Sequence, residues 1–408
     1  MKTLLTAAWV ATMDGATVRE GGVVHEAGKI VAVGAAKALR QAHPDATFEE
    51  LGDAVLLPGL INAHSHLDLT FAKRPPGPIT FTDWVLKLLE QIQREDSDTS
   101  GGSIWTGMND SLVCGVTCIG DVTATPSGVR GVIGLQPRRP RVVSYGEVRA
   151  MASRRGLLDE RLIAATEPTM SPLTRIGVSP HAPYSIEPHG IRECLAAARR
   201  GKLPLTIHLA ETSDEGQFLA DHRGPLRNLW DAIGGWDDAV PRVEGGPIRY
   251  AKALGLLDYE RASLAHVNYC DDDELRLLGR GRASVVYCPR THRYFGHPPH
   301  RWRDMLAARI NVAIGTDSCA SSPDLNLVDD LRLLHEIAPD VPGETIWSMG
   351  TSRAAKAVGM EGEIGTITPG KAADFAAFAA DCDDPLSAIL ENGAQRPSRV
   401  WVAGESVV

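Results

Sequence analysis

A chain of 408 residues is longer than one compact core usually needs, so we expect one large domain and a smaller companion. Apolar residues make up 43% and charged residues 23% of the sequence, an ordinary globular composition that argues against disorder. The formal net charge of -9 argues against partners that require a basic surface, namely nucleic acids and acidic membranes. A small-molecule substrate is favoured instead.

The seven cysteines are scattered and mostly lie in apolar runs, so we predict no disulfide framework and a reducing, cytoplasmic location. The chain starts with MKTLLTAAWVA, which could be taken for a secretory signal. This run continues into strand and turn patterns without a clear cleavage site. No apolar run reaches the ~18 residues that a membrane-spanning helix requires, so no membrane partner is expected.

The first part of the chain, residues 1–55, contains short β-rich runs separated by glycine turns. Strands are predicted at TLLTAAWV, GGVVHE and KIVAVG, and one helix at AAKALRQAH. Strand patterns return in residues 362–408, at GTITPGKAADFAAFA and SRVWVAGESVV. We therefore predict a small β-sandwich domain that is built from both ends of the chain.

Residues 56–361 repeat a pattern in which a short apolar strand is followed by an amphipathic helix. The candidate strands are LLPGLINAH, GVTCIGDV, RVVSYGEV, RIGVSPH, LPLTIHLAE, ASLAHV, ASVVYCP and NVAIGTD. Predicted helices include FTDWVLKLLEQIQ, PHGIRECLAAARRG and DDELRLLGRG. This alternation predicts the α/β class, with a (β/α)8 barrel of the TIM type between the two halves of the small domain.

Potential metal ligands stand where the predicted strands end. The first strand ends in His64 and His66, which point to the same face because they are two residues apart. Three later strands lead into His208, His266 and Asp317. Because the strands of a parallel barrel end on one face, these side chains are expected to converge. Imidazole and carboxylate together suit zinc, with iron or manganese as alternatives, whereas an isolated histidine pair can also be purely structural.

Glu211 stands three residues after His208, in the segment HLAE. This spacing does not keep the carboxylate on the metal once the chain bends into a loop, so we expect a proton carrier. The alternative is an exposed carboxylate at a helix start.

Four segments, LLPGLINAHSHLDL, IHLAET, LAHVNY and AIGTDSCAS, resemble the motifs of the amidohydrolase superfamily, and PGKAADF resembles its returning small-domain strand. The most similar branch contains triazine hydrolases, guanine deaminase and the adenosylhomocysteine and aminodeoxyfutalosine deaminases. The resemblance covers nearly the whole chain. It implies a metal-dependent barrel enzyme that acts on carbon–nitrogen bonds other than peptide bonds.

The family pattern places one divalent ion, for which zinc is favoured, on His64, His66, His208 and Asp317. It makes Glu211 the proton shuttle, and it has His266 orient the attacking water or polarise the reacting centre. Members with two ions carry a lysine at the end of the fourth strand. This chain reads RIGVSPHAPY there and has no lysine, so one ion is expected.

Four residues are candidates for substrate binding. SPHAPY resembles a family segment that supplies a substrate-facing histidine, here His181, although a histidine held between prolines is the alternative. Glu147 follows the third strand, where an exposed loop carboxylate is the alternative. In residues 290–303, Arg290 and His292 belong to a cationic segment that we expect to cover a polar or anionic substrate. The family more often has asparagine at the His292 position, and a second metal site is the alternative for this segment.

The resemblance implies deamination of an aminated purine or purine nucleoside. A bound ion lowers the pKa of water to about 7, and the resulting metal-bound hydroxide would attack a ring carbon. Glu211 moves the proton, while Asp317 and His266 steady the nucleophile and the intermediate. One alternative is hydrolysis of another C–N bond, as in a cyclic amide, or of a C–Cl bond, as in a triazine. A non-catalytic scaffold on the same fold is the other alternative, and a homo-oligomer is the only protein partner considered.

Overall fold

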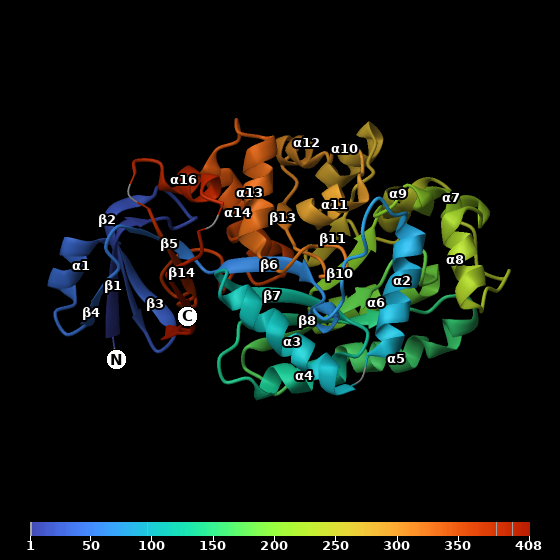
Figure 1. Ribbon diagram of the computed structural model, residues 1–408, viewed down its shortest axis with the longest axis horizontal. Coiled ribbons are helices and arrows are strands. Elements are labelled where there is room, and N and C mark those ends of the chain that lie inside the picture. The colour runs from blue at the N-terminus through green and yellow to red at the C-terminus, as the bar shows by residue number, and fades with distance from the viewer. Residues whose placement is uncertain (1, 96, 381, 394) are drawn as a thin grey trace.

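The computed structural model describes residues 2–95, 97–380, 382–393 and 395–408. Two sheets organise this part of the chain, a parallel barrel and a separate sheet that contains both chain ends (Figure 1). The predicted fold, a TIM-type barrel with a small β domain from both termini, is confirmed.

The small sheet combines strands from the two ends of the chain. The first part supplies β1 (Lys2–Val10), β2 (Val18–Glu26), β3 (Lys29–Ala35), β4 (Thr47–Glu50) and β5 (Ala54–Pro58). The last part supplies β14 (Phe375–Ala379), β15 (Arg399–Val402) and β16 (Glu405–Ser406). The two parts meet at β5, which lies between β1 and β14 and pairs Leu57 with Ala376.

Alternation along the strands gives the small sheet two apolar faces. Leu5 and Val23 pack on one face against Phe375, whereas their neighbours Leu4 and Val24 lie on the other face under α1 (Ala36–Ala42). The boundaries after residues 55 and 361 stay predictions. In the structure, β5 is the last small-sheet strand before the barrel begins.

The barrel strands follow one another in chain order, and each neighbouring pair is parallel. Within the described residues they are β6 (Leu60–Ser65), β7 (Val116–Thr123), β8 (Arg141–Val148), β9 (Thr174–Pro180), β10 (Leu205–Leu209), β11 (Ala262–His266), β12 (Ser284–Tyr287) and β13 (Val312–Ile314). They overlap the runs predicted from the sequence, but the first run, LLPGLINAH, contains the end of β5, a strand of the small sheet, as well as β6. The circle is completed after β13, where the Asp317 N–H donates to the carbonyl of His64 at 3.1 Å.

Helices surround the barrel and continue into its loops. They are α2 (Phe81–Arg94), α3 (Ser97–Leu112), α4 (Pro126–Leu135), α5 (Leu158–Thr166), α6 (Pro188–Gly201), α7 (Asp214–Asp221), α8 (Pro225–Ile233), α9 (Gly246–Ala253), α10 (Asp272–Arg280), α11 (Pro289–Phe295), α12 (Trp302–Ala307), α13 (Leu327–Ile337), α14 (Gly343–Met349), α15 (Ser352–Ala357) and α16 (Pro385–Glu391). Short 3-10 turns cover Leu67–Leu69 and Ala152–Leu157. The starts follow local chemistry, since the Thr80 side chain caps α2 and Pro188 opens α6.

One glycine fixes how closely the first and last barrel strands approach. A Cβ added at Gly315 would lie 2.7 Å from both the Cβ and the carbonyl oxygen of His64. No larger residue fits without moving β13 away from β6. The close approach therefore sets where Asp317 lies relative to His64.

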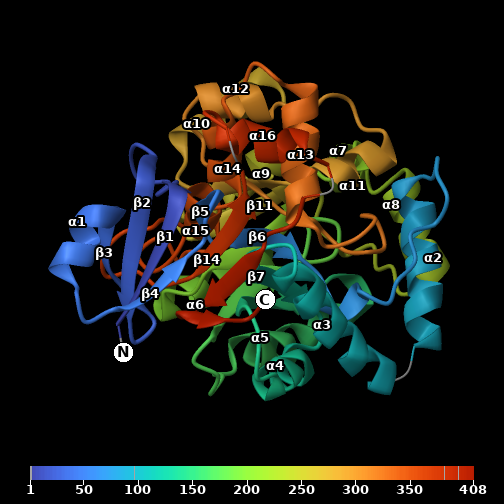
Figure 2. The same cartoon turned by 60° about the vertical axis from the view of Figure 1, so that its left-hand side comes forward.

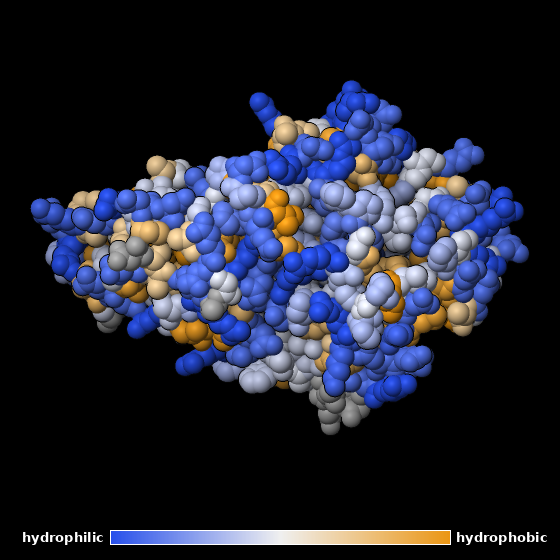
Figure 3. All heavy atoms as spheres, turned by 45° about the horizontal axis from the view of Figure 1, so that its top comes forward, coloured by the Kyte–Doolittle hydropathy of each residue, from blue (hydrophilic) through white to orange (hydrophobic). Residues whose placement is uncertain are grey.

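The small sheet and the helices α2 and α8 lie at opposite ends of the molecule in two views turned by 60° (Figures 1 and 2). The face in Figure 3 is largely hydrophilic, and its apolar patches are scattered. Among the described helices, none has the length and apolar character needed to cross a membrane.

Candidate active site

The ends of β6 and β13 bring two histidines and a carboxylate together. His66 Nε2 lies 3.6 Å from Asp317 Oδ1, and His64 Nε2 lies 3.9 Å from the same oxygen. The other oxygen of Asp317 accepts a hydrogen bond from Ser321 Oγ at 2.9 Å. This bond leaves Oδ1 as the oxygen that faces the histidines.

His208, at the end of β10, completes the predicted ligand set. Its Nε2 lies 3.4 Å from the Nε2 of His66, and its Nδ1 lies 2.9 Å from the backbone carbonyl oxygen of His181. A carbonyl can only accept, so Nδ1 carries the proton and Nε2 is left with its lone pair toward the site. This is the orientation that a metal-binding histidine needs.

Several buried histidine nitrogens lack hydrogen-bond partners, and this bears on whether the residues fit a metal ion. Both ring nitrogens of His64 and the Nε2 of His266 are buried without a hydrogen bond in the described structure. An unsatisfied buried polar group costs about 1–3 kcal/mol. Burial, reinforced by the neighbouring imidazoles, lowers the pKa of His64 and of His208 well below the usual range. The rings are therefore neutral, which is the form that binds metal, so the donor set fits a divalent cation.

His266 ends β11 beside this cluster. One nitrogen each from His64, His208 and His266 lies within 4.8 Å of the others, so His266 is close enough to contact an ion or a water on it. Burial and the nearby His66 lower its pKa to about 3. Its backbone has a φ of +72°, a strained conformation for a residue with a side chain. His300 holds the strained carbonyl of His266 through its Nε2 at 2.9 Å.

Glu211 is buried, with 6% of its surface exposed, so the alternative of an exposed helix-start carboxylate is wrong. Its Oε1 lies 3.5 Å from His266 Nε2, and its Oε2 accepts from the Tyr184 hydroxyl at 2.9 Å. Burial raises the pKa of Glu211 well above its usual range, and the charges of Asp317 and Glu215 raise it further. A carboxyl with a raised pKa accepts a proton more readily than an exposed carboxylate, as a group that takes up and returns a proton must.

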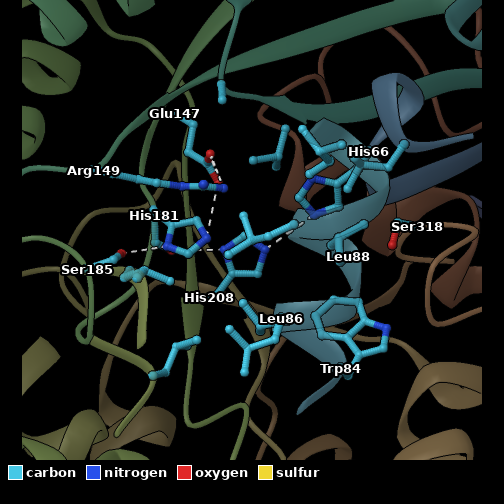
Figure 4. Close-up of a pocket in the computed structure, with 18 of the residues that line it drawn as sticks. His66, Trp84, Leu86, Leu88, Glu147, Arg149, His181, Ser185, His208 and Ser318 are labelled. Carbon is cyan, nitrogen blue, oxygen red and sulfur yellow. Dashed lines mark hydrogen bonds and ion pairs between the residues drawn. The ribbon is translucent and has the colours of Figure 1, made fainter. Parts of the chain in front are cut away.

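A second polar group lies beside His208. Glu147 Oε1 lies 3.3 Å from His181 Nε2, and Arg149 Nη2 lies 2.6 Å from Glu147 Oε2. The other ring nitrogen of His181 meets Ser185 Oγ at 2.5 Å. Figure 4 shows this chain of contacts leading to His208. Glu147 is buried, so the alternative of an exposed loop carboxylate is wrong.

Several of these side chains border a cavity of about 940 Å³. Its polar side includes His66, His181, His208, Glu211 and Asp317, as well as Asp68, Glu147, Arg149, Arg154, Tyr184 and Ser318. Its apolar side is formed mainly by α2 and α8, with Trp84, Val85, Leu88, Leu89, Ile92, Leu229 and Ile233. In Figure 4, Trp84, Leu86 and Leu88 lie across from Glu147 and Arg149. The cavity can hold a ligand with one polar end and one apolar end.

Arg290 and His292 do not line this cavity. The Arg290 guanidinium is buried against Asp330, at 2.9 Å, and Asp324, at 2.7 Å. His292 Nε2 lies 2.9 Å from the carbonyl oxygen of Pro298. The geometry therefore gives no support to a substrate-binding role for either residue, and the cationic segment supports His266 from behind through His300.

The sequence reasoning missed most of the residues that line the cavity, among them Arg149, Tyr184 and Trp84. Arg149 follows Glu147 by two residues, the same spacing that identified the first histidine pair, and Tyr184 belongs to the SPHAPY segment. These signals were available. Trp84 carried no signal, because the apolar pattern of α2 does not tell which neighbour its buried face contacts.

A barrel with clustered histidines, a carboxylate beside them and a second buried carboxyl at its strand ends is typical of metal-dependent hydrolases. The profile of the Amidohydrolase family matches residues 55–407, so the chain belongs to this family and hydrolyses carbon–nitrogen bonds. The resemblance seen in the sequence motifs is confirmed. A bacterial imidazolonepropionase-like composite domain also matches residues 21–46.

The chain is similar to several deaminases in sequence and in fold. The chain is 28% identical over 396 residues to a 5-methylthioadenosine/S-adenosylhomocysteine deaminase of Nitratidesulfovibrio vulgaris, covering 91% of this chain and 82% of the relative. Helicobacter pylori aminofutalosine deaminase in complex with methylthio-coformycin has a TM-score of 0.87 at 20% identity, with all of both chains covered. A Xanthomonas campestris adenosine deaminase with bound zinc has a TM-score of 0.79 at 22% identity, covering 99% and 92%. At these identities the two structures show the shared fold.

Proposed function

We propose that this hydrolase deaminates a purine nucleoside, with a single zinc ion held by His64, His66, His208 and Asp317. The observation that carries the proposal is the position of Glu211. It is a buried carboxylate that lies beside the cluster of His64, His66, His208 and Asp317, here called the ligand cluster, with Oε1 at 3.5 Å from His266 Nε2. A deaminase needs such a group, because one proton must leave a water and another must reach the departing amine.

In the proposed reaction, the oxygen of a water adds to the ring carbon that bears the amino group, and ammonia leaves. When bound, the ion lowers the pKa of that water. Glu211 takes the water proton on Oε1 and returns it toward the leaving nitrogen. His266 faces the same oxygen and orients the water, while Asp317, held by Ser321, accepts a hydrogen bond from it.

The polar side of the cavity supports a nucleoside substrate. His181 and Glu147 border the space next to the ligand cluster, and the pair formed by His181 Nε2 and Glu147 Oε1 can hydrogen-bond to a base, whereas His181 Nδ1 is engaged by Ser185. Asp68 and Arg149 add groups that can bind hydroxyls or a charged substituent, and the α2–α8 side accepts an apolar one. The name of the relative from Nitratidesulfovibrio vulgaris, a deaminase of 5-methylthioadenosine and S-adenosylhomocysteine, supports the same substrate class.

The test is ammonia release by purified, zinc-loaded protein across a substrate panel. The panel contains adenine, guanine, adenosine, 5-methylthioadenosine, S-adenosylhomocysteine and aminodeoxyfutalosine, with a chlorotriazine and a cyclic amide as the competing substrates. We expect ammonia from at least one nucleoside and a content near one zinc per chain. Chloride release from the triazine, or ring opening of the amide without nucleoside turnover, would move the enzyme to another hydrolase class. A metal-loaded protein that is inactive on the whole panel would support the alternative of a non-catalytic scaffold on the same fold.

A further inference from the structure

The residue proposed as the proton shuttle is held at three points. The backbone N–H of Glu211 donates to Glu215 Oε1 at 2.5 Å, and its carbonyl accepts from Asn268 Nδ2 at 2.9 Å. The Tyr184 hydroxyl donates to its Oε2 at 2.9 Å. Each of these partners comes from a different segment. Among the polar atoms of Glu211, only Oε1 is therefore left for chemistry.

Glu215 fixes the backbone at this position. Its fully buried carboxylate accepts from the N–H groups of Ala210, Glu211 and Thr212 at 3.0, 2.5 and 3.3 Å. Ala210 has a φ of +50°, so the chain leaves β10 through a strained turn that these bonds hold in place. The turn directs the Glu211 side chain toward the ligand cluster.

The backbone contacts do not set the side-chain torsions of Glu211, and among the described residues the Tyr184 hydroxyl is the one group that forms a hydrogen bond with the carboxylate. We infer that Tyr184 is a positioning residue, which occupies Oε2 and so reserves Oε1 for proton transfer. Without the hydroxyl, the carboxylate can rotate and present either oxygen to the site. Proximity alone is not enough for fast proton transfer, because the acceptor must also be held in the productive orientation.

The surroundings of Tyr184 argue against a role in packing for its hydroxyl. The ring packs near Phe81 and His181, with centroids 5.9 and 5.7 Å away, while its backbone carbonyl accepts from Trp230. The hydroxyl has no described partner other than Glu211. Removing it leaves these ring contacts in place, so Tyr184→Phe is expected to fold.

The experiment compares Tyr184→Phe with the unchanged protein on a confirmed substrate. A hydrogen bond to a charged group is worth enough to predict a loss of about 10- to 100-fold in kcat, with KM and zinc content nearly unchanged. Tyr259→Phe is the matched control, since it loses hydroxyl bonds to the carbonyls of Ala198 and Leu203 away from the cavity. It should keep its kcat. A crystal structure of Tyr184→Phe should show the Glu211 carboxylate in more than one orientation.

A double-mutant cycle separates positioning from a direct contact of Tyr184 with substrate. In the Glu211→Gln background no shuttle is left to position, so adding Tyr184→Phe should cost little of the residual turnover. A full loss in that background, a rise in KM at constant kcat, or normal turnover of the single variant would each overturn the inference.

The inference rests on the proposed function, and the two fail differently. If Glu211→Gln keeps near-normal turnover, the shuttle itself is wrong. If Glu211→Gln is inactive and Tyr184→Phe is normal, only the positioning role is wrong. Should Tyr184→Phe not fold, Tyr184→Met fills the buried position with an apolar side chain, lacks the same hydroxyl and is expected to lower kcat at constant KM. Unchanged kcat in that variant would overturn the positioning role.

Discussion

The two sides of the cavity are built in different ways. On the polar side, the ligand cluster and Glu211 lie at the ends of barrel strands. The strands are hydrogen-bonded to one another, and the side chains of Glu211, His208 and Asp317 each form a hydrogen bond that orients them. On the apolar side, α2 lies outside the barrel, packs on α8, and is anchored by a bond from Trp84 Nε1 to the Ala320 carbonyl at 2.7 Å. Under the proposed function, the reacting groups lie on the barrel strands, whereas the groups that contact an apolar substituent lie on helices outside the strand ladder.

Among changes on the polar side, removal of a proposed metal ligand is expected to lower turnover the most. In His64→Ala or Asp317→Ala, we expect loss of the ion and of all measurable turnover, because the remaining ligands are too few to hold it. Metal analysis and ammonia release measure both. His189→Ala, which changes a histidine on α6 away from the cavity, is the control and should bind metal normally. Retained metal in either ligand variant would show that the ligand set is wrong.

The next largest loss of turnover is expected from Glu211→Gln, which distinguishes a proton shuttle from a metal ligand. Glu211→Gln keeps the size and polarity of the side chain but removes the group that accepts a proton. General acid–base catalysis is worth about 10²–10⁴-fold, so turnover should fall by at least about 100-fold while the metal content persists. Loss of metal in this variant would make Glu211 a ligand.

His181 tests whether one residue serves two functions. Its backbone carbonyl orients His208, whereas its side chain faces the cavity. His181→Ala keeps the carbonyl, so metal loading should remain while kcat/KM falls by about 10- to 100-fold through lost substrate contacts. Steady-state kinetics and metal analysis give both values. Normal kinetics would return His181 to the structural alternative.

The smallest effect is expected on the apolar side. Leu88→Ala and Ile233→Ala remove apolar surface from the cavity without touching a strand end. At about 0.8 kcal/mol per buried CH₂, KM should rise several-fold for a nucleoside with an apolar substituent. Adenosine, which lacks such a substituent, is the matched control and should show little change. Equal effects on both substrates would mean that this side does not contact the substituent.

The sequence predicted the polar side far better than the apolar side, for a physical reason. Strand periodicity and the common direction of parallel strands are local signals, and they are enough to place His64, His208 and Asp317 on one face of the barrel. The cavity contact of Trp84 depends on how α2 packs against a distant helix. The position of the Arg290 side chain could not be predicted for a related reason, since its carboxylate partner Asp330 comes from α13, 40 residues along the chain. The charge of a segment does not tell whether its side chains face the cavity or a buried partner.

The position of β5 has a consequence for how the protein is made. Its buried AVLLP segment pairs on one side with β1, near the start of the chain, and on the other with β14, near the end. During synthesis at about 5–20 residues per second, the second edge stays bare for roughly tens of seconds, until the whole barrel has been translated. A bare apolar strand edge invites pairing with other chains. Messages cut short before β14 should therefore give aggregating products, even though every residue of the candidate active site is already present in them.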